Sequence, residues 1–156
     1  MNVHVLRLAP GDDLRLALEA TFAQLAPVHG IAAACIVSAV GSLSRAVLRY
    51  ADHAGGSETA GPLELLMLSG TLSADGAHLH ASVADEHGAV KGGHLMPGSI
   101  VRTTVEVVIA LLPGWEFRRE LDAATGYKEL AARKAQPEPG PPSPSPAPKG
   151  KRNRAG

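Results

Sequence analysis

Three histidines near the middle of the chain have the type and spacing of metal ligands. His78 and His80 are separated by one residue, and His94 follows a pair of glycines in the segment HLHASVADEHGAVKGGHL. If residues 77–84 form a strand, His78 and His80 project to the same face, with their Cβ atoms roughly 6–7 Å apart. Two imidazoles at that separation can close onto one ion.

The third ligand depends on a hairpin. If the chain turns at Asp85–Gly88 and returns antiparallel, His94 passes beside the first strand and can reach the same point. Gly92 and Gly93 would let the backbone approach closely there, or adopt angles that other residues avoid. His87 lies in the turn itself and is expected to be solvated.

Three neutral imidazoles favour Zn²⁺, and less exclusively Ni²⁺, Co²⁺ or Fe²⁺. A site with three protein ligands keeps a fourth position open for water, a substrate or an anion. The alternative is that these histidines are ordinary polar residues on a solvated strand, because a His-X-His pair on an exposed strand is common.

Few other residues could assist such a site. Glu106 lies in the apolar segment TTVEVVIALL, where a carboxylate needs a partner or a function. It could accept a hydrogen bond from a ligand histidine or transfer a proton, or it could be a charge at a subunit interface. Glu64 has the same ambiguity. Arg102 and Lys91 could hold an anion at the open position of the metal, or simply lie on a solvated face.

The elements that must position these residues are mostly strands. One helix is predicted over residues 14–26, ended by Pro27 and Gly30, because Leu14, Leu18, Phe22 and Leu25 form one apolar stripe. Strand patterns separated by glycine-containing turns cover residues 3–8, 31–40, 43–51, 63–72, 77–84, 90–95, 100–112 and 115–121. Residues 52–61 are predicted to be a loop, and 127–134 a helical turn. One helix against six to eight strands predicts an α+β fold with a curved, mostly antiparallel sheet.

The composition divides the chain into a domain over residues 1–132 and a Pro-rich, basic, disordered tail over residues 133–156. Proline recurs too often after Gln136 for regular structure. The formal net charge is zero, so no global field attracts nucleic acid. Four basic residues of the tail are the candidates for contacting it: Lys149, Lys151, Arg152 and Arg154.

Several features predict a cytoplasmic protein. Cys35 is the only cysteine and lies in an apolar run, which suits a core position and a reducing compartment. The N-terminus lacks the pattern of a signal peptide, and no apolar stretch reaches the ~18 residues of a membrane helix. Aromatic residues make up only 3% of the chain, so oligomerisation would help to stabilise a core of small apolar side chains.

Five blocks, in order and spacing, resemble the plants-and-prokaryotes-conserved (PPC) domain in its stand-alone prokaryotic form, over about residues 1–132. These blocks are SAVGSLSRAVLR (38–49), ELLMLSGTLS (64–73), HLHASVADEHGAVKGGHL (78–95), TTVEVVI (103–109) and EFRRELDAATGYKEL (116–130). The resemblance implies an α+β subunit that assembles as a homotrimer. It also implies that His78, His80 and His94 match a histidine pattern at which prokaryotic members hold metal, usually assigned as zinc.

The same resemblance suggests an association with DNA. Plant members join this domain to AT-hook segments that contact the minor groove, and prokaryotic members are described as DNA-binding by analogy. This chain has no Arg-Gly-Arg-Pro core of an AT-hook. Its tail could grip phosphates weakly and without sequence preference, or it could only aid solubility.

The fold is also expected to be similar to that of acetolactate decarboxylase, whose zinc is held by three histidines, two of them with the same His-X-His spacing. The leading interpretation is a trimeric, metal-binding module with a ligand-binding or DNA-associated regulatory role. The alternative is a small metal-dependent lyase or hydrolase acting on a carboxylate or keto acid through the three histidines and Glu106. A third interpretation is an assembly domain whose metal only stabilises the trimer.

Overall fold

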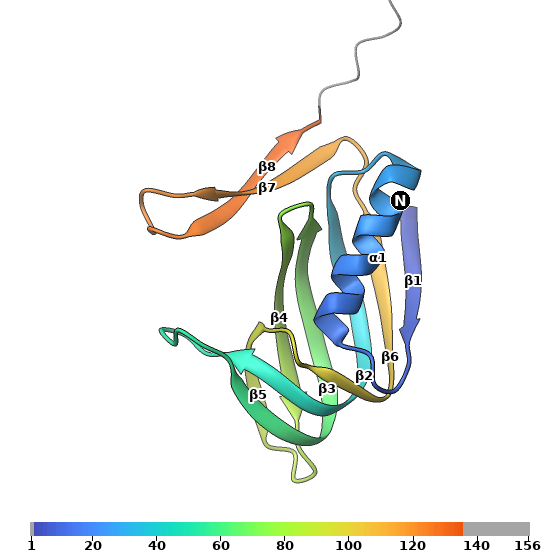
Figure 1. Ribbon diagram of the computed structural model, residues 1–156, viewed down its shortest axis with the longest axis vertical. Helices are drawn as coiled ribbons and strands as arrows, with labels where there is room; N and C mark the ends of the chain where they lie inside the picture. Colours follow the sequence, from blue (N-terminus) through green and yellow to red (C-terminus); the bar gives the residue numbers. More distant parts are fainter. Residues whose placement is uncertain (1, 136–156) are drawn as a thin grey trace, which may run out of the picture.

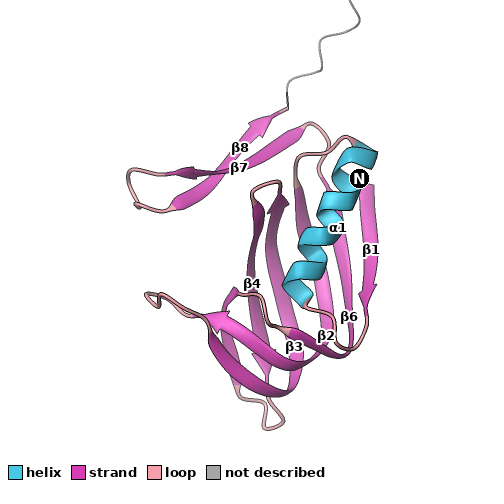
Figure 2. Ribbon diagram, in the orientation of Figure 1, coloured by secondary structure: helices cyan, strands magenta, loops and turns pink. Residues whose placement is uncertain are grey.

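A computed structural model describes residues 2–135 of the chain. One helix lies across a six-stranded sheet, and a separate two-stranded hairpin extends from one end of that sheet (Figure 1). The elements are β1 (Asn2–Leu8), α1 (Leu14–His29), β2 (Ala34–Arg49), β3 (Ser57–Ser73), β4 (Gly76–Ala84), β5 (Val90–Leu95), β6 (Ile100–Leu111), β7 (Trp115–Leu121) and β8 (Lys128–Lys134). Figure 2 shows how strands dominate the described chain.

The main sheet has the strand order β1-β6-β2-β3-β4-β5, and every neighbouring pair is antiparallel. The far end of β2 also pairs with β5, joining Leu48 to Leu95 and Arg49 to His94. This second pairing of β2 curls the sheet so that β5 meets two strands. The predicted α+β class with one main helix and a curved, antiparallel sheet is confirmed.

Helix α1 packs against the inner face of the sheet through Leu14, Leu18 and Phe22, three of the side chains in the predicted apolar stripe. The carboxylate of Asp13 caps the first turn by accepting hydrogen bonds from two backbone N–H groups. The helix continues past Pro27 to His29 and ends at Gly30, which has left-handed angles of φ 59° and ψ 41°. The prediction ended the helix too early, because a proline in the last turn removes only one backbone hydrogen bond.

The side chains of β4 alternate between a core face and an outer face of the sheet. Leu79, Ala81 and Val83 are buried with the side chains of the neighbouring strands, while His78 and His80 project to the other side. In β6, Val105 and Val107 are likewise buried, and Glu106 between them is exposed. We call the side away from α1 the outer face of the sheet.

Two local predictions were wrong. Residues 128–134 form strand β8 and no helical turn, so the predicted domain boundary at residue 132 falls inside a strand. The segment KELAARK is rich in helix formers, but its pairing with β7 overrides that preference. Residues 57–61, predicted to be loop, open strand β3 and pair with β2.

Within residues 2–135, no helix has the length and apolar character needed to cross a bilayer. The four basic tail residues, Lys149, Lys151, Arg152 and Arg154, and the rest of the predicted disordered tail after residue 135 fall outside the described residues.

Candidate metal centre

The three histidines converge at the edge of the sheet formed by β4 and β5. His80 and His94 are directly paired across the two strands, and His78 lies two residues from His80 on the same face. One nitrogen of each ring lies within 4.8 Å of the others. The ring centroids are 5.1–5.6 Å apart. One ion at ordinary metal–nitrogen distances can reach all three nitrogens.

The return of β5 depends on a tight turn after β4. The carboxylate of Asp85 accepts hydrogen bonds from the backbone N–H groups of Ala89 and His87, at 2.9 Å each. These bonds, that of Ala89 first, lower the pKa of the Asp85 carboxyl. Gly88 completes the turn with a φ of 78°. The side chain of Asp85 therefore fixes the loop that returns His94 toward His80.

Gly93 allows β5 to approach β2. A Cβ atom at this position would lie 2.8 Å from the carbonyl oxygen of Arg49, closer than real Cβ atoms approach backbone. The predicted close approach at the Gly92–Gly93 pair is therefore confirmed. It matters for the site because the neighbouring His94 is the residue that pairs with Arg49.

Two arginines contact the imidazoles from different elements. Nη1 of Arg119, on β7, lies 2.9 Å from Nδ1 of His78. Nη1 of Arg15, on α1, lies 3.3 Å from Nε2 of His94. Arg15 is also held by the backbone carbonyls of Leu95 and Ala77, at 2.8 and 2.9 Å. The helix and the hairpin thus both reach the histidine cluster.

Burial and the surrounding cations keep two of the rings neutral. Burial, followed by the charges of His78 and Arg49, lowers the pKa of His94 to about 4. Burial, followed by the charge of Arg119, also lowers the pKa of His78. Both imidazoles are therefore neutral at pH 7, the state in which a ring nitrogen can donate its lone pair to a metal ion.

The cluster fits a metal ion by a further test. Nδ1 of His94 is buried and has no hydrogen-bond partner among the described residues. An unpaired buried polar atom costs free energy, which a bond to a metal ion or a reorganised ring would remove. His78, His80 and His94 would hold the ion, which would act as a Lewis acid at its open position.

The remaining candidates from the sequence lie away from the histidines within one subunit. Glu106 and Arg102 are exposed on β6, which is separated from β4 by β2 and β3, roughly 14 Å across the sheet. Glu64 is exposed on β3, in the pair with Ala84 at the far end of β4.

Lys91 and His87 are on the same hairpin as the cluster but do not join it. Lys91 pairs with Val83, so it faces opposite to His94, and its Nζ approaches the hydroxyl of Thr59 at 3.5 Å. His87 is exposed in the turn, as predicted, with Glu86 at 3.5 Å.

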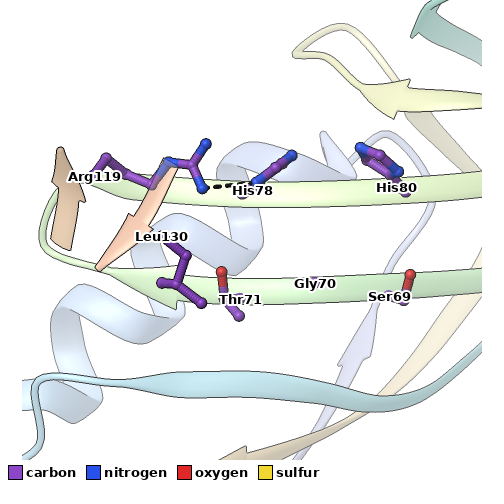
Figure 3. Close-up of a pocket in the computed structure, with 7 residues that line it drawn as sticks. All are labelled: Ser69, Gly70, Thr71, His78, His80, Arg119 and Leu130. Carbon is purple, nitrogen blue, oxygen red and sulfur yellow. Dashed lines mark hydrogen bonds between the residues drawn. The ribbon is translucent and has the colours of Figure 1, made fainter. Parts of the chain in front are cut away.

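A pocket of about 220 Å³ opens beside His78 and His80 on the outer face (Figure 3). Ser69 and Thr71 form its floor, because they are the direct β3 partners of His80 and His78. Arg119 and Leu130 of the hairpin close one side. A second hollow of about 410 Å³ shares His78 and Arg119 and adds His94 and Lys128.

Arg119, Arg15 and Lys128 were missed by the sequence analysis. Arg119 lies in a segment predicted to be a strand, Lys128 in one predicted to be a helical turn, and Arg15 in an ordinary turn of the helix. Their distance along the chain from the histidines gives no local signal. Only the fold brings them to the cluster.

The sheet, its single helix and the converged imidazoles define a small α+β domain that carries a candidate three-histidine metal site. The sequence profile of the Plants and Prokaryotes Conserved (PCC) domain, also abbreviated PPC, matches residues 1–113. This chain belongs to that family.

Two curated relatives show how the domain is used in longer proteins. The bifunctional protein GlmU of a Synechococcus strain is 48% identical over 130 residues, covering 83% of this chain and 20% of the relative. The AT-hook motif nuclear-localized protein 8 of Arabidopsis thaliana is 30% identical over 115 residues, covering 68% of this chain and 28% of the relative. The chain therefore spans 20–28% of the length of these relatives.

Two solved structures match most of both chains. A hypothetical protein from Salmonella has 39% identity and a TM-score of 0.81, with 86% of this chain and 95% of that chain covered. A metal-containing protein from Archaeoglobus fulgidus has 33% identity and a TM-score of 0.69, with 84% and 94% covered.

Proposed function

We propose that this chain is a metal-binding, self-assembling regulatory module, in which His78, His80 and His94 hold one Zn²⁺ or a similar divalent transition-metal ion. The observation that carries the proposal is the convergence of three imidazole nitrogens within 4.8 Å. The buried, unpartnered Nδ1 of His94 supports it, as does the similarity to a metal-containing protein. The single cysteine suits a reducing cytoplasm.

The metal content of the purified wild-type protein tests this proposal. We expect close to one transition-metal ion per chain by elemental analysis, and a lower unfolding temperature after removal of the ion by a chelator, because an ion that binds only the folded state stabilises it. A protein that contains no metal, and whose unfolding temperature added Zn²⁺ does not raise, would contradict it.

A metal-dependent enzyme is the second candidate, favoured by the pocket beside His78 and His80. The expected likeness to acetolactate decarboxylase belongs to this candidate, as does chemistry on a small carboxylate or keto acid. Among the described residues, Asp75 is the only carboxylate that lines either hollow next to the histidines. It is already engaged by Arg118 at 3.7 Å and by the backbone N–H of Arg119. We therefore favour binding over catalysis. Turnover of a small keto acid by the zinc-loaded protein would reverse that preference.

The proposed assembly is a homotrimer joined through the outer face of the sheet. Its support is a set of exposed apolar side chains on β1, β2 and β3, in a domain with few aromatic residues: Val3, Val5, Val37, Val40, Leu66 and Met67. Exposed apolar side chains on a sheet are typical of subunit contacts, and here they lie on both sides of β6. Glu106 is paired with Val40 on β2, so in this assembly it would be a charge at the interface.

Replacing Val40 by lysine tests the interface. We expect the trimer to dissociate at micromolar concentration, because the substitution would put a longer, charged side chain into an apolar contact, where its desolvation costs free energy even beside Glu106. Light scattering coupled to size-exclusion chromatography measures the mass. Val28→Lys is the matched control, since Val28 is 76% exposed on α1, and it should leave the mass unchanged. A Val40→Lys protein with the mass of the wild type would remove this face from the assembly.

An association with DNA is proposed for the tail, supported by the basic residues near the C-terminus and by the AT-hook relatives. We expect weak binding to duplex DNA that weakens steeply with salt and disappears when residues 136–156 are deleted, because only phosphate contacts would contribute. Fluorescence anisotropy at two salt concentrations measures it. Unchanged affinity after the deletion would show that the folded domain binds the duplex.

A further inference from the structure

The contact between Arg119 and His78 is incompatible with a metal ion on His78. A guanidinium has only hydrogen-bond donors, so at 2.9 Å it requires the lone pair on Nδ1 of the imidazole. An ion bound to Nδ1 takes that lone pair. An ion bound to Nε2 leaves the proton of the neutral ring on Nδ1, where it faces the donor of Arg119. In both cases metal binding breaks the bond between the two side chains.

Arg119 remains beside the site after that bond is broken. Its Nη2 donates to the backbone carbonyl of Lys128, and Glu129 lies 4.0 Å away, so the guanidinium stays attached to the hairpin. Its Nη1 then has no partner and lies between the two hollows that adjoin His78. A charged donor released in this way needs a new acceptor.

The charge balance determines which acceptor is suitable. Three neutral imidazoles leave both charges of a divalent ion uncompensated. Arg49 and Lys128 add positive charge, while Glu19 is paired with Arg15, Asp75 with Arg118, and Glu129 with Arg119. The loaded site is therefore short of negative charge, and the described residues lining it offer no free carboxylate to supply it.

The pocket over Ser69 and Thr71 limits the size of a ligand on that side of His78, although the neighbouring hollow is larger. Its volume of about 220 Å³ is below the roughly 300–1,000 Å³ of pockets that hold drug-sized molecules. The hydroxyl groups of Ser69 and Thr71 are on the same side as the imidazoles, as Figure 3 shows, and they can donate to an oxygen atom. Leu130 gives one apolar wall.

We propose that Arg119, freed from His78 by the metal ion, forms with the open coordination position a binding site for a small oxyanion, a carboxylate or a phosphate. The inference rests on the metal site proposed above and extends it. One oxygen of the anion binds the ion, and the guanidinium donates to the other. The partner of Arg119 therefore depends on the metal ion. In the metal-free protein Arg119 contacts the imidazole of His78, and in the metal-loaded protein it contacts the anion.

The experiment titrates acetate and inorganic phosphate, in separate arms, into cobalt-loaded and metal-free protein at constant chloride. We expect a saturable change in the visible spectrum of Co²⁺ with at least one of the two anions, and calorimetry should show no binding of that anion to metal-free protein. The anion that changes the spectrum at the lower concentration, acetate or phosphate, shows whether the site prefers a carboxylate or a phosphate. Chloride at the same ionic strength should produce no change.

Variants of the hairpin distinguish a direct contact of Arg119 with the anion from a non-specific effect of removing one positive charge. Arg119→Gln should weaken anion binding about tenfold or more, the effect of one charge-assisted hydrogen bond, and should leave metal affinity unchanged or raise it by removing the competing donor. Arg119→Lys keeps the charge and should recover part of the anion affinity. Arg133→Gln is the matched control, because Arg133 of the same hairpin pairs with Glu120 at 2.6 Å and does not line either hollow, and it should bind the anion as the wild type does.

The outcomes distinguish the two proposals. A wild-type protein that takes up no metal overturns the metal site and this anion site together. A protein that binds one metal ion but neither anion overturns only the anion site. Equal anion affinity in Arg119→Gln and wild type, or equal affinity with and without metal, also overturns it.

Discussion

Replacing His80 by alanine is expected to lower the affinity of the protein for Zn²⁺ by more than about 100-fold. Loss of a residue that merely orients a metal ligand costs about 10–100-fold in affinity, and loss of a ligand itself should cost more. His80 is suited to this test because it is exposed, so the substitution removes a ligand with little effect on the core. The zinc content after dialysis, and competition with a chromophoric chelator, measure the change.

His87→Ala is the matched control for this substitution. His87 is in the same hairpin but is exposed in the turn and lies outside the cluster. It should retain the metal content and zinc affinity of the wild type. Equal zinc affinity in the His80 and His87 variants would mean that the cluster does not hold the ion.

Replacing Gly70 by alanine should destabilise the domain by about 3 kcal/mol or more, because two effects add. Gly70 has a φ of 140°, which side chains rarely adopt. Its new Cβ atom would overlap the carbonyl oxygen of His78 on the neighbouring strand. Since His78 would have to move, the substitution should also weaken zinc binding. Urea-induced unfolding with and without Zn²⁺ measures both effects.

Gly55→Ala provides the comparison for Gly70. A Cβ atom at Gly55 meets no atom within 4 Å, and its φ lies outside the positive range. The stability of that variant should stay within about 0.5 kcal/mol of the wild type. If both variants unfolded at the same urea concentration, Gly70 would not be the point of close approach between β3 and β4 that the structure describes.

The sequence predicted the position of the histidines well because the information is local. Strand alternation put His78 and His80 on one face, and a four-residue turn brought His94 back, which is now found directly opposite His80. The stripe on α1 and the close approach at Gly93 were also readable from residue types. The histidine hairpin and the helical stripe each lie within one short, continuous segment, whereas the strand that Gly93 approaches, β2, is far from it along the chain.

What the sequence could not predict depends on the hairpin β7–β8, which lies at the β3–β4 end of the sheet, beside the histidines. Helix-forming residues in β8 indicated the wrong structure, and its pairing with β7 could not be inferred from them. Without that hairpin, Arg119 had no reason to be placed near His78. For Glu106 the local pattern was misleading. Its apolar neighbours suggested a carboxylate in need of a partner or a function, but side chains of a strand alternate between faces, so the neighbours are buried and Glu106 is exposed.

The pairing of β1 with β6 has a consequence for synthesis of the chain. Asn2 pairs with Leu111, and Leu8 with Val105, so β1 has no neighbour in the sheet until the second half of β6 is available. At translation rates of about 5–20 residues per second, that partner arrives roughly 5–20 s later. Nascent β1 must therefore stay unpaired for seconds outside the ribosome, a period in which a chaperone can shield its valines. Once β6 emerges, the sheet can close in a single late step.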